Sequence, residues 1–192
     1  MTPYDLESLV DDAYARAGLR RGELVPPTKL ARLLGYEVHF VPNMRTMGSR
    51  ARLEGRKIIG VRSSLLFAGR QHTTGHELGH ELLEEAGVGP HEYTEEDCDY
   101  LGAAMVIPRR CVRDDAQALA LSHKTSETLA LLRIGEVLGE PVAVVAPLTV
   151  RARGEAQWPE PSVLRSWSRR PRPGLRAVRL QDDRQRIALR TA

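Results

Sequence analysis

Residues 76–80 read His76-Glu77-Leu78-Gly79-His80, a His-Glu-x-x-His pattern. On an α-helix, side chains four residues apart lie on one face, so His76 and His80 can direct their imidazoles at one metal ion. Glu77 lies about 100° round the helix from His76, within reach of a water molecule held by that metal. Neutral imidazoles are zinc ligands, and a free carboxylate can take a proton from the water. The stretch therefore predicts a catalytic metal site on a helix.

A catalytic zinc site usually needs a third protein ligand, and the region after the motif is rich in acids. Between Gln71 and Pro108 there are nine Asp/Glu and no Lys or Arg, a charge that a divalent cation would offset. Glu95 and Asp99 are four residues apart on a predicted second helix. We predict that Glu95 ligates the metal, and that Asp99 accepts a hydrogen bond from the outer nitrogen of a ligating histidine. This pairing is that of gluzincin-type zinc peptidases.

Neighbouring residues offer alternatives to Glu95. Glu96 and Asp97 are competing third ligands, but Asp97 lies on another face of the helix, so it cannot serve together with Glu95. Acids in the first turn of a helix also favour its dipole, which is our preferred interpretation of both. Cys98 can bind a metal, although we interpret it as a small buried side chain.

A peptidase also needs a hydrogen-bond donor for the oxyanion of the transition state. His72 lies one turn before His76 and is expected to line the cleft, rather than to be a fourth ligand. The sequence does not choose among the four candidate donors, which are Tyr93, Tyr100, His72 and His39.

The motif helix has two possible starts. Thr74-Gly75-His76-Glu77 matches a capping box, which would engage Glu77 with its own backbone. We prefer a longer helix from Leu65 or Gly69, capped by Ser63 or Ser64, to Ala86. Hydrophobic periodicity and turn residues predict the other elements: helices over 4–17, 29–34 (capped by Thr28), 94–107 (capped by Thr94), 109–121 and 125–138 (capped by Thr125), strands over 36–41, 57–62 and 142–145, a weak strand at 51–53, and a hairpin of 176–180 with 186–189.

Composition bounds the class of protein. The 192 residues suit one domain, or one with an appendage, and no apolar run approaches the roughly 18 residues that span a membrane. The N-terminus has no signal-peptide pattern and there are only two cysteines, so we expect a cytoplasmic protein with reduced thiols. Residues 151–192 hold 11 Arg and 4 Asp/Glu. We interpret this tail as a solvated surface, with contact to nucleic acid or an acidic partner as the alternative.

The same residues carry a resemblance to the ImmA/IrrE family of metallopeptidases. Leu33–Pro42 resembles the family's early helix and strand, and Arg70–Leu83 is similar to its motif helix. Glu95–Pro108 looks like its second signature, an acid-led helix that runs through small residues to proline. Ile107 replaces the usual Met, and Asp99 stands where the family often has Asn. The likeness covers about residues 28–140.

The resemblance implies that His76, His80 and Glu95 hold zinc and that Glu77 is the general base. It implies a zincin-like core with a small sheet (1–108), a helix-turn-helix-like segment (109–140) and a β-rich, Arg-rich region of unknown role (141–192), an α+β protein. Zinc is the expected metal, with manganese possible. The family is associated with cleaving or inactivating helix-turn-helix repressors, in mobile elements and in the radiation response of some bacteria.

The expected function is therefore cleavage of a helix-turn-helix transcriptional repressor. Two alternatives stay open: an anti-repressor that binds metal and acts without proteolysis, and a DNA-binding regulator. The last would use residues 109–138 and the Arg-rich tail, yet Arg133 is one of few basic residues on the second of these helices. A recognition helix usually presents more basic and polar side chains.

Overall fold

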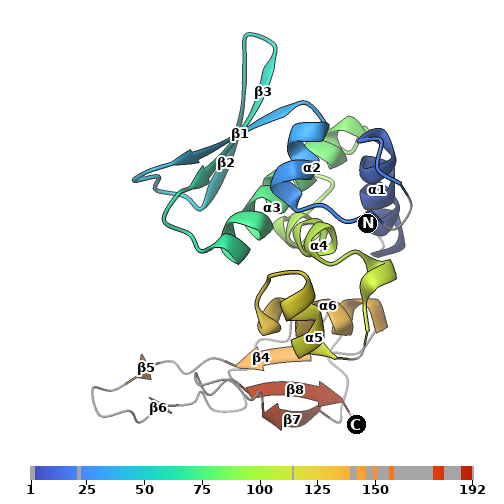
Figure 1. The fold of residues 1–192 in the computed structure, drawn as a ribbon, viewed down its shortest axis with the longest axis vertical. Coiled ribbons are helices and arrows are strands. Elements are labelled where there is room, and N and C mark those ends of the chain that lie inside the picture. The colour runs from blue at the N-terminus through green and yellow to red at the C-terminus, as the bar shows by residue number, and fades with distance from the viewer. Residues whose placement is uncertain are drawn as a thin grey trace.

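Helices and a three-stranded sheet share one core, so the predicted α+β class is confirmed (Figure 1). The structure, a computed structural model, describes residues 3–20, 23–113, 115–138, 142–145, 149–150, 156–157, 175–179 and 187–191. In chain order the elements are α1 (Pro3–Arg16), α2 (Pro27–Leu33), β1 (Tyr36–Val41), β2 (Gly48–Leu53), β3 (Arg56–Arg62), α3 (Phe67–Glu85), α4 (Glu95–Val106), the 3-10 helix η1 (Arg109–Cys111), α5 (Ala116–Ser122), α6 (Glu127–Leu138), β4 (Val142–Val145), β5 (Thr149–Val150), β6 (Ala156–Gln157), β7 (Leu175–Arg179) and β8 (Ile187–Thr191).

Helices α3 and α4 cross with their backbones in contact. A Cβ atom built on Gly75 would lie 2.9 Å from the Cα of Gly102, and one built on Gly102 would lie 2.9 Å from the backbone nitrogen of His76. Gly79 makes a similar approach one turn later, where a Cβ would lie 3.1 Å from that of Leu101. Only residues without a side chain allow helices so close. The crossing therefore fixes the turn of α3 that carries His76 against α4.

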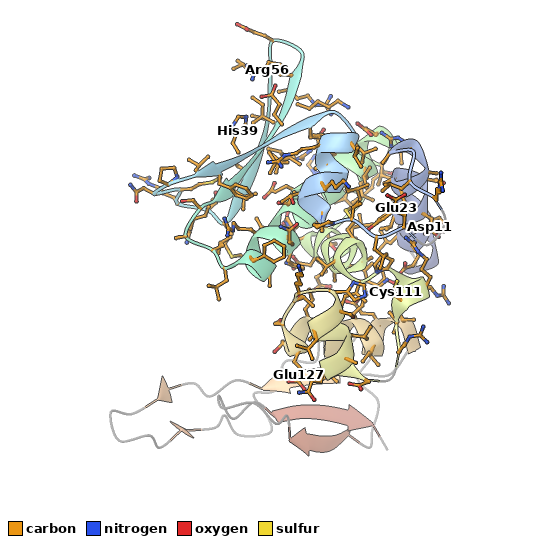
Figure 2. The ribbon with its side chains drawn as sticks, viewed as in Figure 1. Asp11, Glu23, His39, Arg56, Cys111 and Glu127 are labelled. Carbon is orange, nitrogen blue, oxygen red and sulfur yellow. The ribbon has the colours of Figure 1, made fainter. Side chains whose placement is uncertain are left out.

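The first sheet has the order β1-β3-β2, with β1 parallel and β2 antiparallel to β3. The β2–β3 hairpin turns at Glu54 and Gly55, both with positive φ, as a tight hairpin turn requires. Figure 2 shows Arg56 near the tip of this hairpin. The expected weak strand at 51–53 is longer than predicted, because β2 pairs with β3 over its whole length from Gly48. Strand β2 is an edge strand.

Ion pairs fasten this sheet to α3. Arg50 of β2 lies 3.2 Å from Glu81 and 2.6 Å from Glu84 of α3, and Lys57 of β3 lies 2.6 Å from Glu85. Glu81 is buried, so its charge needs an ion-pair partner such as Arg50. The edge strand is thereby held over the motif helix.

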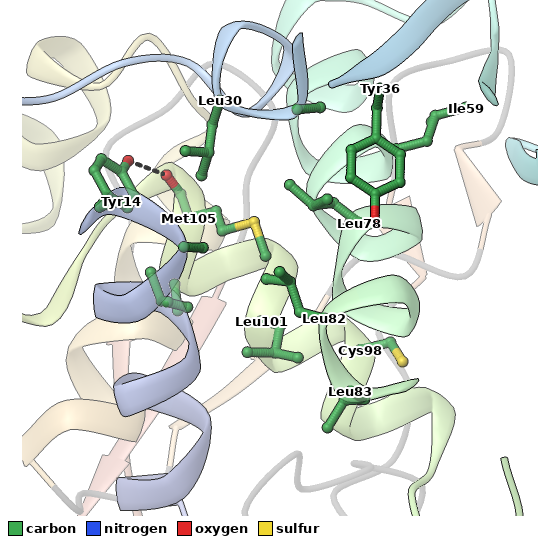
Figure 3. Packing of buried hydrophobic residues seen from close by; sticks show 14 of the residues in the cluster. Tyr14, Leu30, Tyr36, Ile59, Leu78, Leu82, Leu83, Cys98, Leu101 and Met105 are labelled. Carbon is green, nitrogen blue, oxygen red and sulfur yellow. Dashed lines mark hydrogen bonds between the residues drawn. The ribbon is translucent and has the colours of Figure 1, made fainter. Parts of the chain in front are cut away.

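The core lies between α1, α2, the sheet and the α3–α4 pair (Figure 3). The hydroxyl of Tyr14, on α1, donates to the carbonyl oxygen of Met105 at 3.2 Å, the bond drawn in Figure 3. This bond ties the N-terminal helix to α4. The largest fully buried apolar side chains of this cluster are Leu6, Val10, Leu30, Ile59, Val61, Leu78, Leu83, Leu101 and Met105.

Helix α6 is joined to the core by a buried arginine. The Arg133 side chain is 0% exposed, and its guanidinium forms an ion pair with Glu7 of α1 and stacks on the ring of Tyr100. Its Nε donates to the carbonyl oxygen of Ile107 at 2.9 Å. Helix α6 therefore packs on the core through a charged group that is taken out of water. A second apolar cluster lies beside it, made of Val106, Ile107, Leu119, Ala120, Ala130 and Ile134.

Several helix boundaries differ from the predictions. The helix expected over 109–121 is two short pieces, η1 and α5, because Asp115 caps a new helix by accepting from the nitrogen of Ala118. Helix α3 begins after Leu66 without a side-chain cap, so the predicted caps Ser63 and Ser64 are wrong, whereas the preference for a start before Thr74 is confirmed.

Of the three other predicted helix caps, one is confirmed and two are wrong. Thr28 does not cap α2, since Pro26 holds that position and Thr28 bonds to Gln71. Near the start of α6 the side chain that accepts a backbone N–H is Ser126, not the predicted Thr125. Thr94 caps α4, as expected.

The C-terminal strands form separate small sheets. β7 and β8 pair antiparallel, which confirms the predicted hairpin, and β4 adds to β8. The predicted turn over residues 181–185 lies outside the described residues, and the short pair β5–β6 was not predicted. Within the described ranges, every helix is too short or too polar to cross a membrane.

Adding a methyl group at the helix crossing should separate α3 from α4. We expect Gly75→Ala to lower the free energy of unfolding by about 1–3 kcal/mol, because backbone atoms cannot move aside as a flexible side chain can. Urea denaturation monitored by circular dichroism measures it. Gly69→Ala on the same helix is the control, since its Cβ would meet Leu65 at an ordinary 3.6 Å. Equal stability of the two variants would contradict the close crossing.

Glu85 should make stability depend on pH. Burial raises the pKa of its carboxyl, but hydrogen bonds from Lys57, Arg16 and Tyr36 outweigh burial and lower this pKa from 4.5 to about 2. The carboxylate therefore stabilises the fold above the unfolded-state pKa, and the stabilisation is lost as pH falls toward the folded-state pKa. The free energy of unfolding of Glu85→Gln should fall less than that of the wild type across this acid range. Urea titrations at several pH values measure these free energies. An equal fall for both proteins would refute the role given to Glu85.

Candidate metal centre

Three donor atoms from two helices converge at one point. The Nε2 atoms of His76 and His80, on α3, are 3.2 Å apart. An Oε atom of Glu95, the first residue of α4, lies 3.2 Å from the first and 3.6 Å from the second. The structure therefore brings together the three residues predicted as ligands, as a group that could hold a metal ion.

These separations fit a tetrahedral metal ion. Zinc bonds of about 2.0–2.1 Å to nitrogen and oxygen imply a spacing of roughly 3.3 Å between ligand atoms. The three measured spacings lie close to that value. The Glu95 side chain is 77% exposed, so the site opens to solvent on that side. One further position is thus accessible to water or substrate, as in catalytic zinc sites.

Asp99 orients His76. Its Oδ1 lies 2.8 Å from Nδ1 of His76, so this nitrogen donates to the carboxylate. The neutral ring then carries its lone pair on Nε2, which faces His80 and Glu95. The structure thus places Asp99 on the outer nitrogen of His76, a candidate ligand, where the sequence predicted it.

His80 is oriented by a chain of three residues. The Tyr93 hydroxyl lies 3.1 Å from Nδ1 of His80 and donates to Glu84 at 3.2 Å. A carboxylate can only accept, so the Tyr93 hydroxyl donates its proton to Glu84. The hydroxyl oxygen of Tyr93 then accepts from Nδ1 of His80. Arg50 holds Glu84 in turn at 2.6 Å. The lone pair of His80 therefore also lies on Nε2.

The charges around the cluster favour a cation. Burial opposes protonation of His76, but the hydrogen bond and charge of Asp99, with the charges of Glu77 and Glu95, raise the pKa of His76. Burial and the neighbouring His76 lower the pKa of His80, which favours the neutral ring that binds metals. The surrounding charges therefore favour one positive charge between the two imidazoles, and a divalent ion can supply it.

Glu77 lies beside the cluster without a partner of its own. Its side chain is buried, burial raises the pKa of its carboxyl, and among the described residues no group donates a hydrogen bond to it. Gly48 of β2 makes room for it, since a Cβ there would lie 2.4 Å from Oε1 of Glu77. A carboxylate that is free, desolvated and next to a metal site is suited to accept a proton from water.

The other acids of α4 do not join the cluster. Asp97 is buried in a capping box: it accepts from the backbone nitrogen of Thr94 at 2.9 Å, and its own nitrogen donates back to the threonine hydroxyl. The group of possible ligands includes Glu95 and neither Asp97 nor Glu96. Cys98 is buried and lies 3.3 Å from Nδ1 of His80, not Nε2, and burial raises the pKa of its thiol to about 12. Its sulfur therefore lies on the side of the His80 ring away from the three converging donor atoms.

The four candidate oxyanion donors have other surroundings. Tyr93 lies behind His80, where it orients the ring. Tyr100 donates to Glu7 at 2.8 Å, in the contact with α1 and α6. His72 is engaged with the backbone of Asp99, and exposed His39 pairs with Glu37 on β1. None of them is brought to the point where Glu77 and the three ligands meet.

The sequence pointed to the ligands but not to Arg50, Glu84 or Gly48. Arg50 directly precedes the weak strand that was predicted over 51–53. The one signal was charge: three acids at positions 81, 84 and 85 of the motif helix follow a basic stretch over 45–57. Such complementarity predicts contact, although not which arginine reaches which acid.

Comparisons with known proteins add only the fold. No protein family profile and no curated protein sequence matches this chain. The chain is similar to a solved structure of a Mycobacterium tuberculosis transcriptional regulator, with a TM-score of 0.53 at 17% sequence identity. The match covers 85% of this chain and 56% of that one, so this chain spans little more than half of that protein's length. At this identity the likeness concerns the arrangement of elements alone.

Metal affinity should depend on Asp99 as well as on the ligands. We expect His76→Ala to abolish binding of one zinc per chain, and Asp99→Ala to weaken it about 10–100-fold through loss of ring orientation. Competition with a chromophoric chelator measures the affinity. His39→Ala is the control, because this exposed histidine pairs with Glu37 instead. Wild-type affinity in Asp99→Ala would show that the 2.8 Å contact does not tune the site.

Proposed function

We propose that this chain is a zinc-dependent endopeptidase of the zincin-like ImmA/IrrE type, which cleaves a helix-turn-helix transcriptional repressor and so derepresses genes. One observation carries the peptidase proposal. Glu77, buried and without a hydrogen-bond donor among the described residues, lies beside three converging donor atoms with tetrahedral spacing. Structural metal sites are closed, whereas this cluster opens to solvent beside a spare carboxylate.

His76, His80 and Glu95 would hold the ion. Bound zinc would polarise the scissile carbonyl and acidify a water molecule. Glu77 takes the proton of the attacking water, because its carboxylate accepts no hydrogen bond from another described residue. It then gives the proton to the leaving amine. Asp99 and Tyr93 keep the two imidazoles in the tautomer that leaves Nε2 free.

The edge strand supplies a place for a peptide substrate. β2 pairs with β3 on one side, and among the described residues no strand pairs with its other side. Its first residue, Gly48, lies against Glu77, and Arg50 ties it to the motif helix. An extended peptide that adds to this edge would pass next to the general base. This arrangement favours a peptide substrate over a small molecule.

The link to gene regulation rests on two supports. The resemblance of the motif helix and the acid-led helix to the ImmA/IrrE family implies a repressor as substrate. The name of the structural neighbour places that protein in transcriptional control. A repressor with a helix-turn-helix domain is therefore our proposed partner. If the repressor is inactivated but stays intact, the anti-repressor alternative holds instead.

Direct DNA binding through α6 has less support. Arg133 is buried and paired with Glu7, so its charge does not reach a DNA backbone. Lys124, before the helix, is the other basic residue over 120–138. Recognition helices need accessible donors for phosphates and base edges.

Replacing the proposed base should separate catalysis from binding. We expect Glu77→Gln to bind zinc and fold as the wild type does, but to cleave the repressor encoded nearest to its gene about 10²–10⁴-fold more slowly, because the amide cannot accept a proton. Electrophoresis of repressor incubated with zinc-loaded protein measures the rate.

Glu96→Gln is the matched control, since Glu96 is an acid on α4 outside the cluster. It should cleave at the wild-type rate. Cleavage by Glu77→Gln at that same rate would contradict the mechanism.

A further inference from the structure

Large apolar side chains gather on the surface at one end of the first sheet. Nine such side chains are exposed among the described residues, and five of these belong to segments that meet at this end. Their exposed fractions run from 38% to 78%. Exposed apolar groups that cluster usually mark a binding surface. Phe40 and Val41 are consecutive residues of β1 and point to opposite faces of the sheet, so we leave Val41 out and call the other four the apolar patch: Phe40, Met47, Leu66 and Phe67.

Backbone hydrogen bonds bring these segments together. The carbonyl oxygen of Val41 accepts from the nitrogen of Ser63 at 3.0 Å, and that of Met47 accepts from the nitrogen of Arg62 at 2.8 Å. Leu66, at the start of α3, follows three residues after Ser63. In Figure 1 this end of the strands meets the start of α3, while the β2–β3 hairpin projects at the opposite end.

The apolar patch adjoins the candidate metal centre. Met47 directly precedes Gly48, whose missing side chain leaves room for Glu77 and Thr73. A peptide on the free edge of β2 that passes Glu77 would next meet Met47. The patch therefore continues the proposed substrate path and is not a separate surface.

The surroundings of the patch are basic. Residues 38–49 and 59–76, which include the patch, contain no Asp or Glu but three Arg. One of these, Arg70, stacks on the ring of Phe40 with 5.0 Å between the guanidinium carbon and the ring centroid. Its Nε is buried and has no hydrogen-bond partner. This nitrogen is too buried for a bound acceptor to reach, so a substrate carboxylate would meet the outer nitrogens of the guanidinium.

We propose that the apolar patch and Arg70 form a specificity subsite for the substrate. It takes a segment in which a large aliphatic or aromatic side chain stands next to an acidic residue. The apolar side chain packs on Met47 and Phe67, and the carboxylate accepts from Arg70. This inference rests on the proposed peptidase function, which it deepens by stating which segments of the repressor can be cut.

The test is a degenerate peptide library digested by the zinc-loaded full chain, with the products identified by mass spectrometry. The same library is captured by immobilised Glu77→Gln, which reports binding without cleavage. We expect both to select peptides with Leu, Ile, Met or Phe beside Asp or Glu.

Three surface variants then separate the parts of the subsite. Met47→Ser should lower kcat/KM for a selected peptide about tenfold or more. Arg70→Gln should remove the preference for the acidic peptide over its Gln analogue. Leu53→Ser is the matched control, an apolar residue 56% exposed at the other end of β2, and should change neither. Melting temperatures check that each variant is folded.

The outcomes distinguish the two proposals. Cleavage without an apolar or acidic preference, or with preferences that Met47→Ser and Arg70→Gln leave intact, overturns the subsite and leaves the peptidase standing. No cleavage by the wild type, with selective capture by Glu77→Gln that Met47→Ser weakens, overturns the peptidase but supports the subsite. If the library is neither cleaved nor selectively captured, both proposals are refuted.

Discussion

The contact between the backbones of α3 and α4 determines the rest of this structure. Gly75 and Gly102 let the helices touch where any side chain would hold them apart. This contact places the first turn of α4 beside the middle of α3, so that Glu95 reaches the same point as His76 and His80 and Asp99 reaches the back of His76. A larger distance between the helices would leave two histidines on a surface, with no third ligand. The convergence of the three candidate ligands thus depends on the close packing of two glycines.

The sequence predicted those parts of the site that follow from position along one helix. His76 and His80 share a face because they are four residues apart, and the same spacing puts Glu95 and Asp99 on one face of α4. Thr94 was recognisable as a cap because Ser, Thr, Asp and Asn in that position satisfy free backbone N–H groups. That the two faces meet was inferred from the density of acids and the absence of Lys and Arg between residues 71 and 108. Local periodicity and charge were enough to predict that His76, His80 and Glu95 converge.

The parts that sequence could not predict depend on contacts between distant segments. Arg50 reaches Glu84 only because β2 pairs with β3 and lies over α3. The Tyr93 hydroxyl then bonds to both Glu84 and His80, which links Arg50 to the ring. Tyr100 resembled a possible catalytic donor, yet it lies with Arg133 and Glu7 where α1, α4 and α6 meet. The helix expected over 109–121 breaks because Asp115 starts a new helix, a choice that hydrophobic periodicity does not resolve. Each of these outcomes was decided by tertiary packing, which overrides local preference.

The central claim is that two imidazoles and one carboxylate hold a metal ion with a position open to water. X-ray absorption at the zinc edge of the zinc-loaded chain tests it most directly. The structure predicts two nitrogen ligands and one or two oxygen ligands at about 2.0–2.2 Å, with no sulfur. In Glu95→Ala, one oxygen ligand should be replaced by water and the affinity should fall. A sulfur ligand at about 2.3 Å, which would implicate Cys98, or an unchanged zinc affinity in Glu95→Ala, would contradict the account.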